Sequence, residues 1–215
     1  MARDAGTTSF FAVLDRVGTF VTANLLWIFC SLPIVTMPAA TAGLFAILAP
    51  WARGKQPEPF AAFFGAFRQQ WRKSTVIFVI DLIVASIVVA NVSILARMDM
   101  GQFLTRISQV MTLFLAIVAL MINLYVWPLL VTFEMPLRQI FNTAARLAFG
   151  HAIWSLGLLI AALLPLLLTL LLPAMFAVIL TFATSALIVS LGSWRVIRRY
   201  VVPEELAKLE AQKTM

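Results

Sequence analysis

Four long stretches almost free of charge constrain this chain more than any other feature. They run from Val17 to Ala52, from Ser74 to Ala96 with Asp81 as the one charged residue, from Ile107 to Phe133, and from Ala152 to Trp194. A helix needs about 20 apolar residues to cross a bilayer. The second and third stretches therefore suit one crossing each, and the first and last suit two.

The composition leaves lipid as the solvent for most of the surface. Hydrophobic residues make up 62% of the chain and charged residues 12%, with a mean hydropathy of +1.00. Soluble domains average about 45–50% apolar and about 25% charged residues, and an apolar surface of this size in water would aggregate. We therefore predict an all-α, polytopic transmembrane bundle. It forms one domain over residues 1–201, followed by a cytoplasmic tail over residues 202–215.

Prolines divide the first and last stretches into two arms each, which gives about six membrane-embedded segments. Pro33 and Pro38 interrupt the first stretch, and Pro173 interrupts the last; proline ends or kinks a helix. The arm Val17–Ser31 is short for a full crossing. The first two segments are therefore either two crossings or a re-entrant hairpin, and both arrangements return the chain to the same side.

The distribution of Lys and Arg predicts the orientation. With both termini in the cytoplasm, every Lys and Arg except Arg97 and Arg106 lies on the inner side, as the positive-inside rule requires. The net charge of +7 would suggest nucleic acid in a soluble protein. Here the basic residues lie in short loops beside apolar segments, so we expect contact with anionic lipids of the inner leaflet instead.

A basic amphipathic helix is predicted over Pro59–Lys73. Large aromatic residues recur at helical spacing, and basic and polar residues fall on the other faces. The aromatic set is Phe60, Phe63, Phe64, Phe67 and Trp71, and the polar set is Arg68, Gln69, Arg72 and Lys73. We expect this helix to lie in the inner membrane interface, or alternatively to dock a partner through Phe64, Phe67, Arg68, Trp71 and Arg72.

A second amphipathic helix is predicted from Pro136 to Gly150. Its apolar side carries Leu137, Ile140, Phe141, Ala144 and Ala148, and its polar side carries Arg138, Gln139, Asn142 and Arg146. The same two roles apply, and Arg138 is its candidate binding residue.

The residues for metal or hydrolytic chemistry are scarce. The chain has one His and one Cys, too few for a metal site, and it lacks phosphate-binding loops, nucleophile elbows and zinc-protease motifs. Cys30, inside an apolar run, is interpreted as a small packed residue. We therefore predict a protein with no catalytic residues, no metal and no cofactor.

Asp81 is the one ionisable residue well inside a predicted crossing, where a carboxylate is costly unless it is paired, hydrated or protonated. Two interpretations stay open: a proton or cation relay or substrate contact, and an interhelical hydrogen bond or pairing with a basic residue. Asn91 and Asn123 are expected to form interhelical hydrogen bonds. His151, at the start of the fifth crossing, is a candidate pH-sensitive residue.

Several motifs resemble the YesL family of small bacterial membrane proteins, which have no established activity. They are Leu14-Asp15-Arg16-Val17-Gly18, Asn24-Leu25-Leu26-Trp27, Ser31-Leu32-Pro33-Ile34-Val35-Thr36 with Pro38-Ala39, the segment from Phe63 to Trp71, and Tyr125 to Leu130 followed by Leu137 to Leu147. The resemblance implies the bacterial cell membrane and an association with carbohydrate-uptake ABC importers. It transfers no catalytic residue.

The leading hypothesis is a non-enzymatic accessory protein of such an importer, acting through contacts with its permease or other subunits. The alternative is a small transporter or channel with Asp81 in its pathway. A membrane enzyme has least support, because no acid–base pair or metal site is visible.

Overall fold

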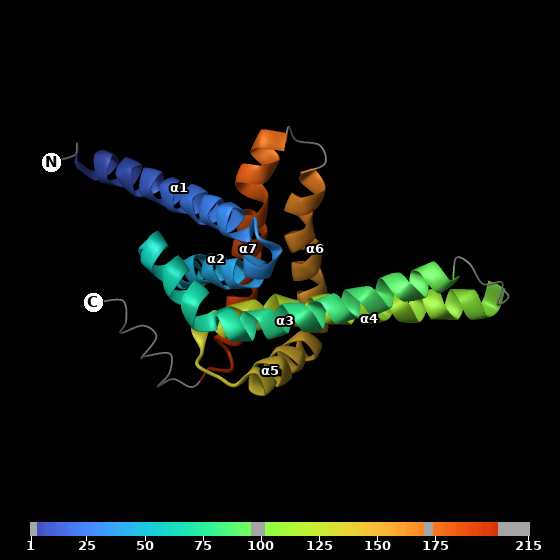
Figure 1. Ribbon diagram of the computed structural model, residues 1–215. Helices are drawn as coiled ribbons and strands as arrows, with labels where there is room; N and C mark the ends of the chain where they lie inside the picture. Colours follow the sequence, from blue (N-terminus) through green and yellow to red (C-terminus); the bar gives the residue numbers. More distant parts are fainter. Residues whose placement is uncertain (1–3, 96–101, 170–173, 202–215) are drawn as a thin grey trace.

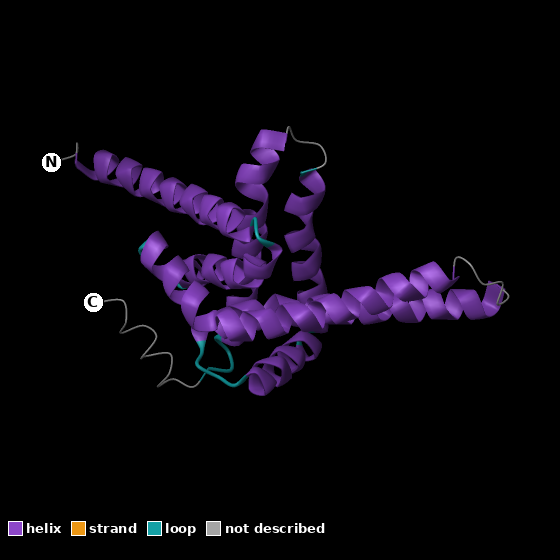
Figure 2. Ribbon diagram, in the orientation of Figure 1, coloured by secondary structure: helices purple, strands orange, loops and turns teal. Residues whose placement is uncertain are grey.

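The computed structural model describes residues 4–95, 102–169 and 174–201, and these residues form helices and short connections without a strand (Figures 1 and 2). The elements are α1 (Asp4–Ser31), the 3₁₀ turn η1 (Ile34–Thr36), α2 (Met37–Ala52), α3 (Pro59–Leu95), α4 (Gln102–Thr132), α5 (Leu137–Gly150), α6 (Ala152–Leu168) and α7 (Ala174–Ile197). The predicted all-α class is confirmed. The proline break at Pro173, Arg97 and the tail after residue 201 lie outside the described residues.

Three segments are long and apolar enough to cross a membrane: Ile34–Ala52, Pro59–Ile94 and Phe103–Thr132. A fourth crossing is possible if α5 and α6, which meet at 101°, form one bent span. These segments, found in the described part of the chain, support a multi-helix membrane protein. The sequence-based count of six embedded segments stays a prediction.

Helix α2 lies at the centre of the bundle and contacts α1, α3, α4 and α7 (Figure 1). Small buried residues, among them Ala39, Ala40 and Ala42, allow its neighbours to approach closely. At Gly43 the approach is closest, because a Cβ atom there would lie 2.7 Å from Cδ2 of Phe63 on α3. The glycine therefore makes room for a fully buried aromatic ring.

The Thr36 side chain contacts two backbone carbonyls at the joint between α1 and α2. The Thr36 hydroxyl lies 2.6 Å from the Cys30 carbonyl oxygen and 2.8 Å from that of Pro33. Carbonyls at a helix end otherwise lack an intrahelical partner. Leu32 and Ile34 are exposed, so the joint presents an apolar surface although the chain turns there.

The residues of the opening motif hold α1 against α2 and α7. The Asn24 side-chain oxygen accepts a hydrogen bond from the Ala183 backbone N–H at 3.0 Å, and Asn24 is fully buried. The Trp27 ring stacks on Phe182 with centroids 4.1 Å apart, and its Nε1 donates to the Thr41 hydroxyl at 3.1 Å. Asn24 and Trp27 of this motif therefore join α1 to its two neighbours.

The predicted amphipathic helix over Pro59–Lys73 is not a separate element, because the chain continues as one helix, α3, to Leu95. Figure 1 shows the first turns of α3 running at an angle to the rest. The hydroxyls of Ser74 and Thr75 both donate to the Trp71 carbonyl, at 3.0 and 2.8 Å, and such back-bonding bends helices. The bend takes the place of the expected break.

The aromatic face of this segment also differs from the prediction. Phe63 is fully buried in the protein, whereas Phe60, Phe64 and Trp71 are exposed. The expected lipid-facing stripe is thus divided between the protein core and the outer surface. The polar residues Arg68 and Arg72 are exposed, as the pattern indicates.

Helix α5 begins after Pro136 and ends at Gly150, the predicted bounds. Ile140, Ala144, Leu147 and Ala148 are buried, and Arg138, Gln139, Asn142 and Arg146 are exposed. The buried side packs mainly on α4. Its apolar face therefore meets protein, and its placement in the membrane interface stays a prediction.

Candidate functional site

Helices α3 and α4 form a long antiparallel hairpin that extends away from the other helices (Figure 1). Exposed apolar side chains follow both helices; they include Ile83, Ile87, Val89 and Val92 on α3, and Val110, Met111, Leu113 and Phe114 on α4. The outer half of the hairpin therefore has only its own two helices to pack against. In a bilayer, lipid or another membrane protein must cover it.

Asp81, on α3, faces α4 within this hairpin. Nδ2 of Asn123 on α4 donates a hydrogen bond to Oδ1 of Asp81 at 2.6 Å. Among the described residues, no basic side chain forms an ion pair with this carboxylate. The arrangement matches the predicted interhelical hydrogen bond, and Asn123 has the role that the sequence indicates.

A second polar contact joins α3 and α4 farther from the other helices. The Asn91 amide donates to the Ser108 hydroxyl at 3.2 Å and to the Thr112 hydroxyl. Asn91 is ten residues from Asp81, or about 15 Å along the helix at 1.5 Å per residue. Two polar contacts thus fix the register of α3 against α4, and the predicted interhelical role of Asn91 is confirmed.

Another buried polar pair lies between α4 and α6. The hydroxyls of Tyr125 and Ser155 are 2.9 Å apart, and the Ser155 hydroxyl also lies 3.2 Å from the Ala148 carbonyl oxygen of α5. Both residues are fully buried. This contact was not predicted from the sequence, although Tyr125 begins one of the motifs that resemble the YesL family.

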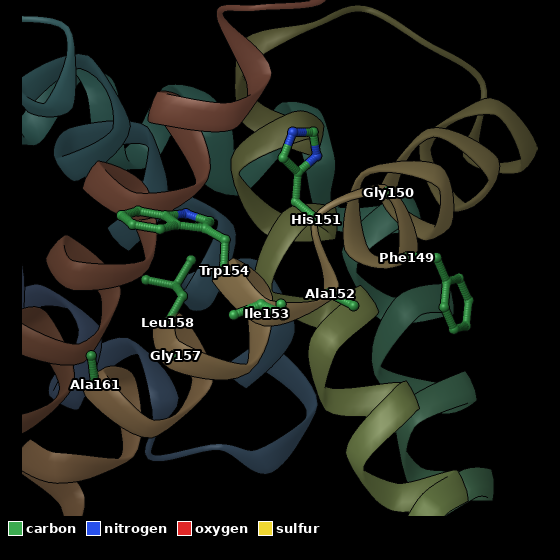
Figure 3. A pocket seen from close by; sticks show the side chains of 9 residues that line it. All are labelled: Phe149, Gly150, His151, Ala152, Ile153, Trp154, Gly157, Leu158 and Ala161. Carbon is green, nitrogen blue, oxygen red and sulfur yellow. The ribbon is translucent and has the colours of Figure 1, made fainter.

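An apolar hollow of about 760 Å³ lies at the sharp joint between α5 and α6. His151 stands at the joint, and the hollow continues along α6 past Trp154, Gly157 and Ala161 (Figure 3). The His151 ring meets the Tyr200 ring edge-on at 5.7 Å, and its Nδ1 is buried without a hydrogen-bond partner in the described structure.

A second hollow, of about 470 Å³, lies where the ends of α2 and α7 meet the start of α6. Arg195, Arg198 and Trp194 line it, together with Trp154, which also lines the first hollow. A third, of about 390 Å³, lies beside Arg16, Trp51 and Lys55. Basic residues and tryptophans therefore gather at this end of the bundle, as they do at membrane–water interfaces.

Arg53, directly after α2, belongs to this end. Its Cζ lies 5.4 Å from the centre of the Trp194 ring, within cation–π range. Its Nε and Nη1 are buried and have no hydrogen-bond partner in the described part of the chain. Because burial penalises the charged form, the pKa of this guanidinium is lowered from its ordinary value.

The structure does not gather the residues singled out from the sequence into one site. Phe64, Phe67, Arg68, Trp71 and Arg72 belong to the first turns of α3, Asp81 lies farther along it, Arg138 is on α5 and His151 is at the α5–α6 joint. Of these, His151 alone lines one of the three hollows. Arg53, Trp154, Trp194 and Arg195 were missed, although tryptophan beside arginine at a helix end is an available signal.

Fold and contacts together define a multi-helix membrane protein in which polar side chains within the apolar segments join neighbouring helices. No group of three metal-ligating side chains occurs among the described residues. Residues 20–92, from the second half of α1 through most of α3, match the family model described as "Protein of unknown function, DUF624".

The chain is also similar to the uncharacterized protein YesL of Bacillus subtilis (strain 168), with 29% identity over 132 residues. The match covers 60% of this chain and 61% of YesL, so the chain spans about three fifths of this curated relative. These matches confirm the resemblance to the YesL family that the opening motifs predict. No solved structure matches the chain.

Proposed function

We propose that this protein is a non-enzymatic accessory protein of the bacterial cell membrane that binds a membrane-spanning subunit of a carbohydrate-uptake ABC importer. The α3–α4 hairpin carries this proposal, because it extends from the bundle with apolar side chains exposed along both helices. The importer is the partner that the resemblance to the YesL family implies. Asp81 and Asn91 are paired across the hairpin, so these polar groups do not prevent it from presenting an apolar surface.

The contacts of Asp81 favour this proposal over a transporter. In a transport pathway the carboxylate would be expected to face a cavity. Here it accepts a hydrogen bond from Asn123 and lines none of the three hollows described above. Asp81 therefore serves best as a contact that stabilises the hairpin.

Affinity purification from native membranes in a mild detergent tests the proposal. The tagged parent protein should recover subunits of a carbohydrate importer. A variant with Val89→Ala and Leu113→Ala on the hairpin should recover much less. The matched control is Phe29→Ala with Leu32→Ala near the α1–α2 joint, where the side chains are similarly exposed; it should behave like the parent.

Two results would contradict the proposal. One is equal recovery of the importer by the hairpin variant and the parent. The other is sugar flux into liposomes that contain this protein alone. That result would favour a transporter that works without a partner protein.

A further inference from the structure

The 760 Å³ apolar hollow and the 470 Å³ hollow that Arg195 and Arg198 line share one wall. An apolar surface and a basic surface therefore lie side by side at this end of the bundle. Trp154 and Leu158 of α6 line both. On one side of them the 760 Å³ hollow runs along α6, and on the other the 470 Å³ hollow reaches the last turns of α7. The two therefore lie next to each other, one apolar and one basic.

Trp154 contacts both the backbone of α7 and one of the two arginines. Its Nε1 donates a hydrogen bond to the Gly192 carbonyl at 3.1 Å, and Cζ of Arg195 lies 5.4 Å from the ring centre. Neither Arg195 nor Arg198 forms an ion pair within the described structure. Two guanidinium groups thus line one hollow without an acidic partner among the described residues, and such groups suit an anion that accepts several hydrogen bonds.

The apolar hollow is open and follows α6 from His151 to Ala161. Gly157 has no atom within 4 Å of where its Cβ would lie, and Ala161 one turn later is also small, so α6 presents little bulk there. Ile153, about one turn before Gly157, and Phe149 at the end of α5 line the same hollow (Figure 3), and Ile153 is 91% exposed. Contact with an acyl chain would remove this apolar side chain from water, which is favourable.

We propose that the joined hollows bind one phospholipid with a net negative headgroup. Its phosphate lies between Arg195 and Arg198, and one acyl chain follows α6 past Gly157 and Ala161. Basic pockets between helices at the inner interface are suited to anionic lipid heads. A neutral phospholipid fills the apolar side equally well but leaves the two arginines less compensated.

Quenching of tryptophan fluorescence by brominated lipid tests this binding in reconstituted membranes. The probes are phosphatidylglycerol with dibrominated acyl chains diluted into ordinary phosphatidylcholine, and dibrominated phosphatidylcholine diluted into ordinary phosphatidylglycerol. The Trp154 contribution is the fluorescence lost in Trp154→Phe. Phosphatidylglycerol should half-quench it at a mole fraction roughly tenfold lower than phosphatidylcholine, as two charges near a membrane surface allow.

Two variants locate the charge that selects the lipid. Arg195→Gln with Arg198→Gln should remove the preference, so that both brominated lipids quench equally. The matched control, Arg138→Gln with Arg146→Gln on the exposed side of α5, loses the same charge and should keep it. The proposed site would be wrong if the Arg195/Arg198 variant kept the preference for phosphatidylglycerol, or if both double variants lost it.

Two measurements on the parent protein decide the proposal even if the arginine variant fails to fold. Equal quenching of Trp154 by the two brominated lipids would contradict it. Relief of phosphatidylglycerol quenching by inorganic phosphate would instead identify a site for a free anion and overturn the assignment to a lipid. Quenching that is selective for phosphatidylglycerol and insensitive to phosphate is the expected result.

Discussion

Asn123 donates a 2.6 Å hydrogen bond to Asp81, and this contact joins the two longest helices of the protein within their apolar segments. The relationship explains how an aspartate can occur inside a predicted crossing without a basic partner. The hydrogen bonds of Asn91 with Ser108 and Thr112 also join α3 to α4, farther along the hairpin. Both contacts link the apolar segments of α3 and α4.

Asp81→Asn should preserve folding better than Asp81→Lys. The asparagine can still accept a hydrogen bond from Asn123, so the loss should be about 1 kcal/mol, the usual scale of such contacts in membranes. The lysine places a long cation in the same site and should cost about 3 kcal/mol. Unfolding in a mixed-micelle denaturant titration measures both, and equal stability of the two variants would contradict a half-buried, paired Asp81.

Gly43→Ala should destabilise the protein by about 1–3 kcal/mol, the typical cost of overpacking. The new methyl group would meet the buried Phe63 ring at 2.7 Å. Gly65→Ala on α3 is the matched control, because nothing lies within 4 Å of its Cβ position; it should be neutral or slightly stabilising. The thermal unfolding midpoints of the two variants give the comparison, and similar midpoints would argue against close packing of α2 on α3.

Ser155→Ala should cost more stability than Tyr125→Phe. Removing the serine hydroxyl leaves the buried Tyr125 hydroxyl without its partner, at about 1–3 kcal/mol. Removing the tyrosine hydroxyl leaves Ser155 its contact with the Ala148 carbonyl, so about 1 kcal/mol is expected. A double-mutant cycle isolates the pair, and additive effects would mean that the two hydroxyls do not interact.

Labelling of single cysteines tests the predicted orientation. In a Cys30→Ala background, an impermeant thiol reagent applied to intact cells should label Gly101→Cys, which lies outside the described residues, and should leave Lys55→Cys unlabelled. The physical reason is the one-sided distribution of Lys and Arg. Labelling at Lys55 with protection at Gly101 would invert the topology.

The sequence indicates where helices occur much better than what each helix face meets. Long apolar stretches and prolines placed the joint after Ser31, and the pattern after Pro136 gave the bounds of α5. Periodicity reports that a face is apolar, but it does not tell lipid from protein, because both solvate apolar side chains. Phe63 was therefore expected at the membrane surface, whereas it packs on Gly43.

The same holds for the polar contacts: the sequence indicates which residues need a partner, but not which residue the partner is. Asn91 and Asn123 were recognisable as interhelical residues because an amide inside a crossing needs a partner. That the partners are Asp81, Ser108 and Thr112 depends on the register of α3 against α4, which no local pattern encodes. A change of direction after Lys73 was expected as a break between two helices, whereas the chain bends there without ending the helix.

Photocrosslinking within native membranes tests the proposed partner most directly. A photoreactive amino acid at Leu113, on the exposed surface of the α3–α4 hairpin, should crosslink to a membrane-spanning subunit of a carbohydrate importer. The same group at Phe29 on α1, which is similarly exposed (65% against 62%), should not. Crosslinks from Leu113 to lipid alone, to a second copy of this chain, or to the same proteins that Phe29 reaches would contradict the account.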